Sequence, residues 1–169
     1  MKTKTSQERP HILLTNDDGI QAEGLLALVR ALKDSADLSV IAPEHNWSAA
    51  GHSKTMHKPL RAWPTTLADG TEALRTSGSP SDCVALALLG LLEEEPDLVI
   101  SGVNLGANVG HDLTYSGTVA AAMESVIGDI SAIAVSLDTF EDPGYEPAAH
   151  FITDLAFRVL PVKGDEQLL

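Results

Sequence analysis

The sequence contains little cysteine, few aromatic residues and few basic residues. Its 169 residues include one cysteine, an aromatic content of 4%, and 11 Lys and Arg against 24 Asp and Glu, which gives a formal net charge of -13. A single cysteine excludes an internal disulfide, and the apolar residues that follow Cys83 predict a buried helical thiol and not a nucleophile. Because phosphate backbones are held mainly by clustered Lys and Arg, the acidic balance excludes broad, sequence-independent binding to nucleic acid.

A long apolar run is also absent. No run reaches the ~20 residues that a membrane span needs, so no association with a membrane is expected. Residues 1–10 are polar and lack the apolar core of a secretory signal, which predicts a disordered lead and a cytoplasmic protein. Residues 11–169 have the size of a single domain, and a hydrophobic fraction of 44% with 21% charged residues is ordinary for a soluble globular protein.

Short apolar runs alternate with amphipathic segments along the chain. Four runs are typical of strands buried on both faces of a sheet: His11–Thr15, Leu38–Ala42, Asp97–Ser101 and Ala132–Ser136. Apolar spacing or alanine content predicts helices over residues 22–33, 84–92, 118–127 and 147–160, with Ser79 and Pro80 as the start of the second. Residues 44–76 predict a long functional loop and a hairpin insertion. The alternation predicts an α/β fold with a three-layer, doubly wound, mostly parallel, Rossmann-like sheet.

Ligands of open α/β sheets bind beyond the carboxyl ends of the strands. Three predicted strands run into oxygen-rich segments there: Asn16-Asp17-Asp18-Gly19, Pro43 to Ser48, and Gly102-Val103-Asn104. Carboxylate, hydroxyl and amide oxygens are the ligands that Mg²⁺ or Mn²⁺ prefers, whereas zinc usually takes several His or Cys. The alternative for the first segment is a turn with Asx hydrogen bonds and a cap for the next helix. Two adjacent carboxylates repel one another unless a cation compensates, so the convergence favours a metal site.

A glycine-spaced segment follows the third of these strands. Its glycines recur at Gly102, Gly106 and Gly110, and Ser116-Gly117-Thr118 then begins a helix. This pattern is neither a P-loop nor a Rossmann fingerprint. Glycines let backbone N–H groups approach a ligand and a helix N-terminus favours an anion, so the segment predicts an anion site, with a flexible capped loop as the alternative. A metal beside an anion site indicates phosphoryl chemistry.

Histidine and tryptophan residues near these segments are secondary candidates. His52 and His57 follow Ser48 and are more often structural or surface residues, whereas His111 lies in the glycine segment and is better placed as a general acid or base. Trp47 either stacks on a nucleobase or packs on its own protein. The residues alone leave the general base unassigned.

Five segments together resemble the SurE family of stationary-phase survival proteins. They are Ile12–Ile20, Ala42-Pro43 with Ser48 and Gly51–Ser53, Ser77–Val84, Ser101–Asn108, and Tyr115–Val119. The resemblance covers His11 to about Val135 in order, which is specific, whereas Asp-Asp-Gly alone would be weak.

The resemblance implies a metal-dependent hydrolase of nucleoside 5′-monophosphates, and often of 3′-monophosphates, that acts as a homodimer or homotetramer. It implies catalytic roles for Asp17 and Asp18, and a site for Mg²⁺ or Mn²⁺ built from Asp17, Asp18, Ser48 and Asn104. It also implies that the substrate phosphate is bound by Asn16, Asn104, Ser116, Gly117 and Thr118.

The end of the chain departs from the family. SurE chains continue past the last helix with a core strand, a protruding hairpin and a C-terminal segment used in subunit exchange, so we expect this chain to be truncated and the ligands to survive. A catalytically impaired or inactive homologue is therefore an alternative function.

Two other classes place acids after a first strand. Haloacid-dehalogenase phosphatases need a nucleophilic aspartate where this chain has Asn16, which excludes them. A receiver-like regulatory module needs a phosphoacceptor aspartate after the strand that here runs into Asn104. That module stays the non-enzymatic alternative, although its acceptor is missing.

Overall fold

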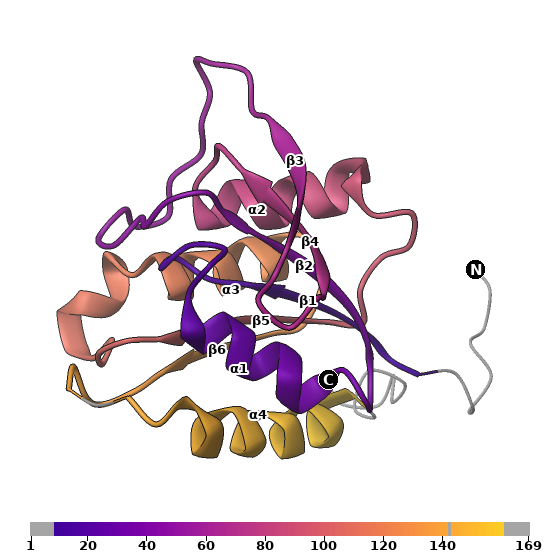
Figure 1. Ribbon diagram of the computed structural model, residues 1–169. Coiled ribbons are helices and arrows are strands. Elements are labelled where there is room, and N and C mark those ends of the chain that lie inside the picture. The colour runs from indigo at the N-terminus through magenta and orange to yellow at the C-terminus, as the bar shows by residue number, and fades with distance from the viewer. Residues whose placement is uncertain (1–8, 142, 161–169) are drawn as a thin grey trace, which may run out of the picture.

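Three layers make up the molecule, a sheet with helices on both faces (Figure 1). The computed structural model describes residues 9–141 and 143–160. The predicted disordered lead falls almost wholly outside the described residues, as does the last part of the predicted domain, from residue 161 on. No helix within the described ranges is long and apolar enough to cross a membrane.

The sheet has six strands in the order β3-β4-β2-β1-β5-β6. Their bounds are β1 His11–Thr15, β2 Asp37–Pro43, β3 Ala62–Thr66, β4 Glu72–Thr76, β5 Leu98–Asn104 and β6 Ala132–Ser136. All neighbours are parallel except β3 and β4, and in the described part of the chain β6 pairs with β5 alone. The prediction of a doubly wound, mostly parallel α/β sheet is confirmed.

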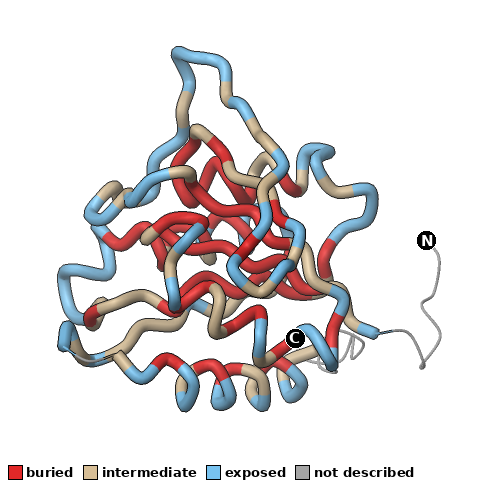
Figure 2. Tube along the Cα trace, viewed as in Figure 1, coloured by how far each residue is buried: buried red, intermediate tan, exposed pale blue. Residues whose placement is uncertain are grey.

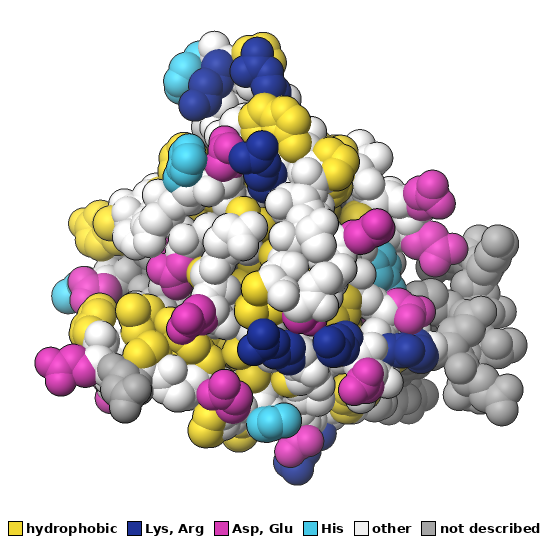
Figure 3. Space-filling model, viewed as in Figure 1, with side chains coloured by type: hydrophobic (Ala, Val, Ile, Leu, Met, Phe, Trp, Pro, Cys, Tyr) yellow, Lys and Arg dark blue, Asp and Glu magenta, His cyan; other side chains and the backbone are white. Residues whose placement is uncertain are grey.

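Helices α1 (Glu23–Leu32) and α4 (Tyr145–Val159) cover one face of the sheet, and α2 (Pro80–Leu86) and α3 (Gly117–Ile127) cover the other. Leu25, Leu28 and Leu32 of α1 are fully buried against the central strands, as their spacing predicts. Figure 2 shows the buried residues concentrated in the central strands and on the inner sides of the helices. Acidic, basic and apolar side chains are interspersed over the face shown in Figure 3.

α2 begins where the sequence predicts and ends earlier than predicted. Ser79 Oγ accepts from the backbone N–H of Asp82, and Asp82 Oδ2 accepts from the N–H of Ser79, a reciprocal cap. After Leu86 the chain continues as a π-helical turn over Ala87–Leu91, in which Gly90 has φ 126°. That left-handed glycine interrupts the predicted helix before Leu92.

The predicted hairpin is present as β3 and β4, and it extends the sheet. β4 pairs in parallel with β2 through Ile41, Ala42 and Pro43. The hairpin therefore forms one border of the sheet, and the loop before it, residues 44–61, leads away from the carboxyl end of β2 (Figure 1).

Cys83 is a buried helical thiol, as predicted. Its Sγ atom lies 3.0 Å from Thr76 Oγ1, and burial raises the pKa of Cys83 to about 12. Because an unfolded chain ionises this thiol near its ordinary value of 9.0, the folded state loses stability as the pH rises above 9.0. We expect iodoacetamide at pH 8 to leave the native protein unlabelled and to label it once in urea, as read by mass spectrometry. Rapid labelling of the native protein would contradict the burial.

Candidate functional site

Three loops meet beyond the carboxyl ends of β1, β2 and β5, the central strands of the sheet. They bring Asp17, Ser48 and Asn104 to the lining of one cavity of about 330 Å³. The N-terminus of α3 contributes Ser116 to the same lining. The topology explains the meeting, because parallel strands end at one edge of the sheet and the crossover direction reverses between β1 and β5.

Asp17 lies between the end of β1 and the start of α3. Its side chain is buried, and Oδ1 accepts a hydrogen bond from Thr118 Oγ1 at 2.5 Å. A Cβ atom on Gly117 would lie 2.7 Å from Asp17 Cβ and 2.9 Å from Oδ2. The first turn of α3 therefore packs directly on this carboxylate, where the helix N-terminus favours a negative charge.

Asp18 connects the three loops. Its Oδ1 accepts a hydrogen bond from Asn46 Nδ2 at 3.3 Å, and its Oδ2 accepts one from the backbone N–H of Leu105 at 3.4 Å. Burial raises the pKa of Asp18 above its ordinary value, the charge of Asp17 raises it further, and the Leu105 N–H opposes both. Asp18 is half-buried and does not line the cavity itself.

Asn16 is fully buried and closes the turn that follows β1. Its Nδ2 donates to the carbonyl of Gly19 at 3.0 Å, and its Oδ1 accepts from the Gly19 N–H at 3.2 Å. The Asx turn that the sequence offered as an alternative thus exists together with the carboxylate pair. The helix cap of that alternative does not, because the N-cap of α1 is Ala22 and has no side-chain hydrogen bond. Phosphate binding by Asn16 stays a prediction.

Asn104 is the last residue of β5, which extends three residues beyond the predicted end at Ser101. The pairing of β5 with β6 shifts register between Ser101 and Asn104. Such an irregularity bends a strand and changes the direction of the side chains at its end. Asn104 Nδ2 donates to the carbonyl of Gly106 at 2.7 Å and to that of Leu105 at 3.3 Å. These two acceptors orient the amide so that Oδ1 is left for a ligand.

Ser48 lies on the loop after β2, and its side chain is exposed. Its backbone N–H donates to Asn46 Oδ1 at 2.7 Å, and the neighbouring Trp47 N–H donates to the carbonyl of Asp17 at 2.8 Å. The Trp47 bond to Asp17, together with the Asn46 bond to Asp18, attaches the loop to the Asp17–Asp18 turn.

Ser116, Gly117 and Thr118 begin α3, one residue earlier than predicted. Ser116 is the N-cap, and its Oγ accepts from the N–H of Val119 at 3.1 Å, which leaves its hydroxyl proton for a ligand. Thr118 is fully buried and donates to Asp17, so it acts on the carboxylate and does not line the cavity. Phosphate binding by all three residues stays a prediction.

The structure does not bring the predicted histidines or Trp47 into the cavity lining. His111 lies in the 3₁₀ turn Gly110–Thr114 with its side chain exposed, and His57 is exposed. The lining also includes Asn108, Asp112, Tyr115 and Phe140, to which the sequence assigned no role, although Asn108 and Tyr115 lie in segments that carry the family resemblance. The glycine segment contains the first three, so its glycine spacing was the signal that marked them, whereas nothing in the sequence marked Phe140.

The donor set fits a hard divalent cation. Asp17, Ser48 and Asn104 line the cavity and Asp18 directly follows Asp17 in the chain, and the lining formed by the described residues has no Lys or Arg to neutralise the carboxylates. Burial, and then the charge of Asp17, raise the pKa of Asp18, so a cation bound there would favour its charged form. Across residues 9–141 and 143–160, no group of three or more His, Cys, Asp or Glu is arranged so that it could hold a metal ion by itself.

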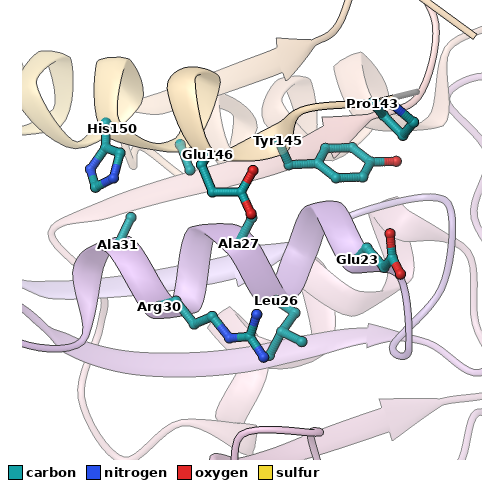
Figure 4. A pocket seen from close by; sticks show the side chains of 10 residues that line it. Glu23, Leu26, Ala27, Arg30, Ala31, Pro143, Tyr145, Glu146 and His150 are labelled. Carbon is teal, nitrogen blue, oxygen red and sulfur yellow. The ribbon is translucent and has the colours of Figure 1, made fainter. Parts of the chain in front are cut away.

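A second cavity, of about 450 Å³, lies between α1 and α4 (Figure 4). Glu146 and His150 of α4 point toward α1 there, and Tyr145 borders the same space. Burial raises the pKa of Tyr145, and the charges of Asp18 and Glu23 raise it further. This cavity holds none of the predicted ligands and lies between helices, away from the three strand ends.

Comparison with known proteins gives a consistent result. The sequence profile of one family, described as survival protein SurE, matches residues 12–168. The 5′-nucleotidase SurE of Chloroflexus aggregans is 58% identical over 126 residues, 75% of this chain and 50% of the relative. That of Herpetosiphon aurantiacus is 52% identical over 160 residues, 94% of this chain and 61% of the relative.

A solved structure is similar as well. The crystal structure of the SurE protein from Aquifex aeolicus matches with a TM-score of 0.80 at 41% identity, and the match covers 90% of this chain and 60% of that one. The chain thus spans between half and about three-fifths of the length of these relatives.

Proposed function

Because this chain belongs to the SurE family, we propose that it is a metal-dependent phosphatase that hydrolyses nucleoside 5′-monophosphates, and also 3′-monophosphates, to nucleoside and inorganic phosphate. The observation that carries the proposal is the cavity in which Asp17, Ser48 and Asn104 face the N-terminus of α3. Oxygen ligands for a cation and N–H donors for an anion then lie around one space, as phosphate-ester hydrolysis requires.

Each side of the cavity has a separate task in this proposal. Asp17, Asp18, Ser48 and Asn104 would hold Mg²⁺ or Mn²⁺, which supplies charge neutralisation of the phosphoryl group and orientation of the attacking water. The Ser116 hydroxyl and the first N–H groups of α3 would bind phosphate oxygens. Asn16 and Thr118 support this arrangement by holding the β1 turn and the Asp17 carboxylate. Assembly as a homodimer or homotetramer stays a prediction.

The test is release of inorganic phosphate from 5′- and 3′-nucleoside monophosphates. We expect hydrolysis with Mn²⁺ or Mg²⁺, loss of hydrolysis in EDTA and recovery when the metal is restored in excess. Hydrolysis that is indifferent to EDTA would overturn the metal mechanism. If the chain hydrolyses nucleotides only when the remaining part of a relative's sequence is fused to its C-terminus, the activity belongs to the longer protein. A receiver-like module predicts no hydrolysis at all, and Asn104 at the end of β5 disfavours it.

The aromatic lining of the cavity predicts a preference for nucleotides. Tyr115 is 62% exposed and Phe140 is 76% exposed, and both line the cavity. Stacking of a base on an aromatic ring contributes roughly 1–3 kcal/mol, so Tyr115→Ala should raise KM for AMP at least about fivefold. KM for β-glycerophosphate, which has no base, should change little. Val109→Ala, at an exposed residue outside the lining, is the matched control. An equal rise in KM for both substrates would argue against base stacking.

A further inference from the structure

The loop that carries Ser48 has no regular secondary structure of its own. We call residues 44–61, which connect β2 and β3, the Ser48 loop; they contain neither helix nor strand. Ala49 has φ 60° and Gly51 has φ 59°, so the backbone turns sharply directly after Ser48. A turn closed by the Ala50 N–H on the Trp47 carbonyl at 3.1 Å, and the bond from the Ser48 N–H to Asn46 Oδ1, fix the local backbone around Ser48. Contacts with the rest of the molecule place this turn, and with it the Ser48 hydroxyl, at the cavity.

Hydrogen bonds hold the Ser48 loop on both sides of Ser48. Before it, the Trp47 N–H donates to the carbonyl of Asp17; after it, the Gly51 N–H donates to the carbonyl of Tyr115, each at 2.8 Å. Further along, Thr55 donates to the Asp82 carboxylate through its N–H at 3.0 Å and its hydroxyl at 2.7 Å. Ser48 thus lies within a short span whose ends are attached to the β1 turn and to the start of α3.

Another attachment is an ion pair on α3. The Glu124 side chain is only 6% exposed, and it receives His52 Nε2 on Oε2 at 2.9 Å and Lys54 Nζ on Oε1 at 2.6 Å. Each carboxylate oxygen therefore has its own donor from the Ser48 loop. Moving the Glu124 carboxylate out of water costs free energy that its ion pairs need not recover, so a gain in stability is a poor explanation for this buried charge. We therefore look for a role of Glu124 in positioning the loop.

Glu124 lies on the same stripe of α3 as Ser116. Ser116, Ala120 and Glu124 are four residues apart and are all buried, which puts them in line on one side of the helix. The Ser48 loop runs along this side of α3. Its Gly51 N–H donates to the Tyr115 carbonyl, and its His52 ring contacts the Glu124 carboxylate. The same helix contacts Asp17 through Thr118. One rigid element is thus in contact with the carboxylate side and the hydroxyl side of the proposed cation site.

From this geometry we infer that Glu124 is a positioning residue, which fixes the Ser48 hydroxyl at the cation site by holding His52 and Lys54. It touches neither metal nor substrate, and it acts only through the Ser48 loop. The inference rests on the proposed function insofar as Ser48 binds a divalent cation, whereas the attachment of the loop can be tested without any metal.

The first experiment follows the loop in metal-free protein. In a Trp63→Phe background, Trp47 is the remaining tryptophan and lies next to Ser48. We expect Glu124→Gln to raise the acrylamide quenching of Trp47, and Glu94→Gln, the same change at an exposed glutamate, to leave it unchanged. Circular dichroism checks that both variants are folded. His52→Gln, on the loop side of the contact, is a second route to the same release. Unchanged quenching in both Glu124→Gln and His52→Gln overturns the inference.

The second experiment measures Mn²⁺ binding by the electron paramagnetic resonance signal of the free ion. Loss of an outer contact to a ligand typically lowers metal affinity by about 10–100-fold, so Glu124→Gln should weaken binding at least about tenfold. Ser48→Ala should weaken it to a similar degree, and the double variant should bind no more weakly than Ser48→Ala alone. Additive losses would show that Glu124 does not act through Ser48 and would overturn the inference.

The two experiments separate failure of this inference from failure of the proposed function. Wild-type protein that binds no Mn²⁺ overturns the proposed function, and with it the cation-site role of Ser48, whatever the quenching result. Wild-type protein that binds Mn²⁺ and loses it in Asp17→Ala, while Glu124→Gln binds normally, overturns the positioning role alone.

Discussion

Replacing Asp18 by asparagine is expected to abolish metal-dependent phosphate release and, at the same time, to stabilise the metal-free protein. The raised pKa of Asp18 means that the folded state disfavours the charged carboxylate, chiefly through burial and then through Asp17. Asparagine has nearly the same shape without the charge, and it loses only one of the two long hydrogen bonds that Asp18 accepts, at 3.3 and 3.4 Å, because its amide nitrogen cannot accept. Because it is also a poorer ligand for a hard cation, hydrolysis should fall at least about 100-fold, the loss expected when an electrostatic contact to the reacting group is removed.

The pH dependence of this effect has a definite sign. The pKa of Asp18 in the folded protein lies above its ordinary value of 3.8, so the folded state takes up the proton first as the pH falls. Wild-type protein therefore regains stability on acidification through the raised pKa, and the advantage of Asp18→Asn disappears below 3.8, where both states are protonated.

Thermal unfolding in EDTA measures the prediction. Tm of Asp18→Asn should exceed that of wild type at pH 7 and equal it near pH 3.5. Asp34→Asn, at an exposed aspartate, is the matched control and should change neither Tm nor phosphate release. A metal-free Asp18→Asn protein that unfolds at a lower temperature than wild type at pH 7 would contradict the electrostatic account.

Gly117→Ala is expected to have the second large effect. The added Cβ would lie 2.7 Å from Asp17 Cβ, closer than such atoms approach, so α3 and the β1 turn must separate. That movement breaks the Thr118 bond to Asp17 and displaces Ser116 from the cavity. A shift of about 1 Å in a reacting group can cost about 100-fold in rate, so we expect kcat to fall by at least that factor.

A second glycine supplies the control for this substitution. Gly144 lies at the start of another helix, as the N-cap of α4, but nothing lies within 4 Å of its Cβ position and its φ is -74°. Gly144→Ala should therefore leave both kcat and Tm unchanged, whereas Gly117→Ala should lower both. Normal kcat in Gly117→Ala would mean that contact between α3 and Asp17 is not needed for hydrolysis.

The sheet could be predicted from the sequence because its signal is local. The run Leu13-Leu14 is apolar on both faces, and the turn residues after Thr15 end the strand, so a central parallel strand needs no knowledge of its partners. The same holds for the start of α2, where Ser79 and Pro80 act within one turn of the helix. The strand end at Asn104 was missed because the glycine at 102 suggested that the strand ends at Ser101.

The candidate site could be predicted only in part. Sequence reasoning placed Asp17, Ser48 and Asn104 at one edge, and they line one cavity, because strand ends of a parallel sheet are constrained to meet. The contact between His52 and Glu124 joins residues 72 positions apart, and no periodicity or spacing in the sequence reports such a pairing. The metal-binding roles of Asp17, Ser48 and Asn104 stay predictions, as does the role of each phosphate ligand.

The position of α4 restricts how the sheet can grow at β6. The connection from β1 to β2 runs through α1 on one face of the sheet. The connection from β5 to β6 runs through α3 on the opposite face, and it leads in the opposite direction along the sheet. Both are consistent with right-handed connections. Since α4 packs on the same face as α1, a right-handed connection through α4 would lead back toward β5, which already has neighbours on both sides. A partner for the outer edge of β6 therefore has to be an antiparallel strand or one that arrives by another route.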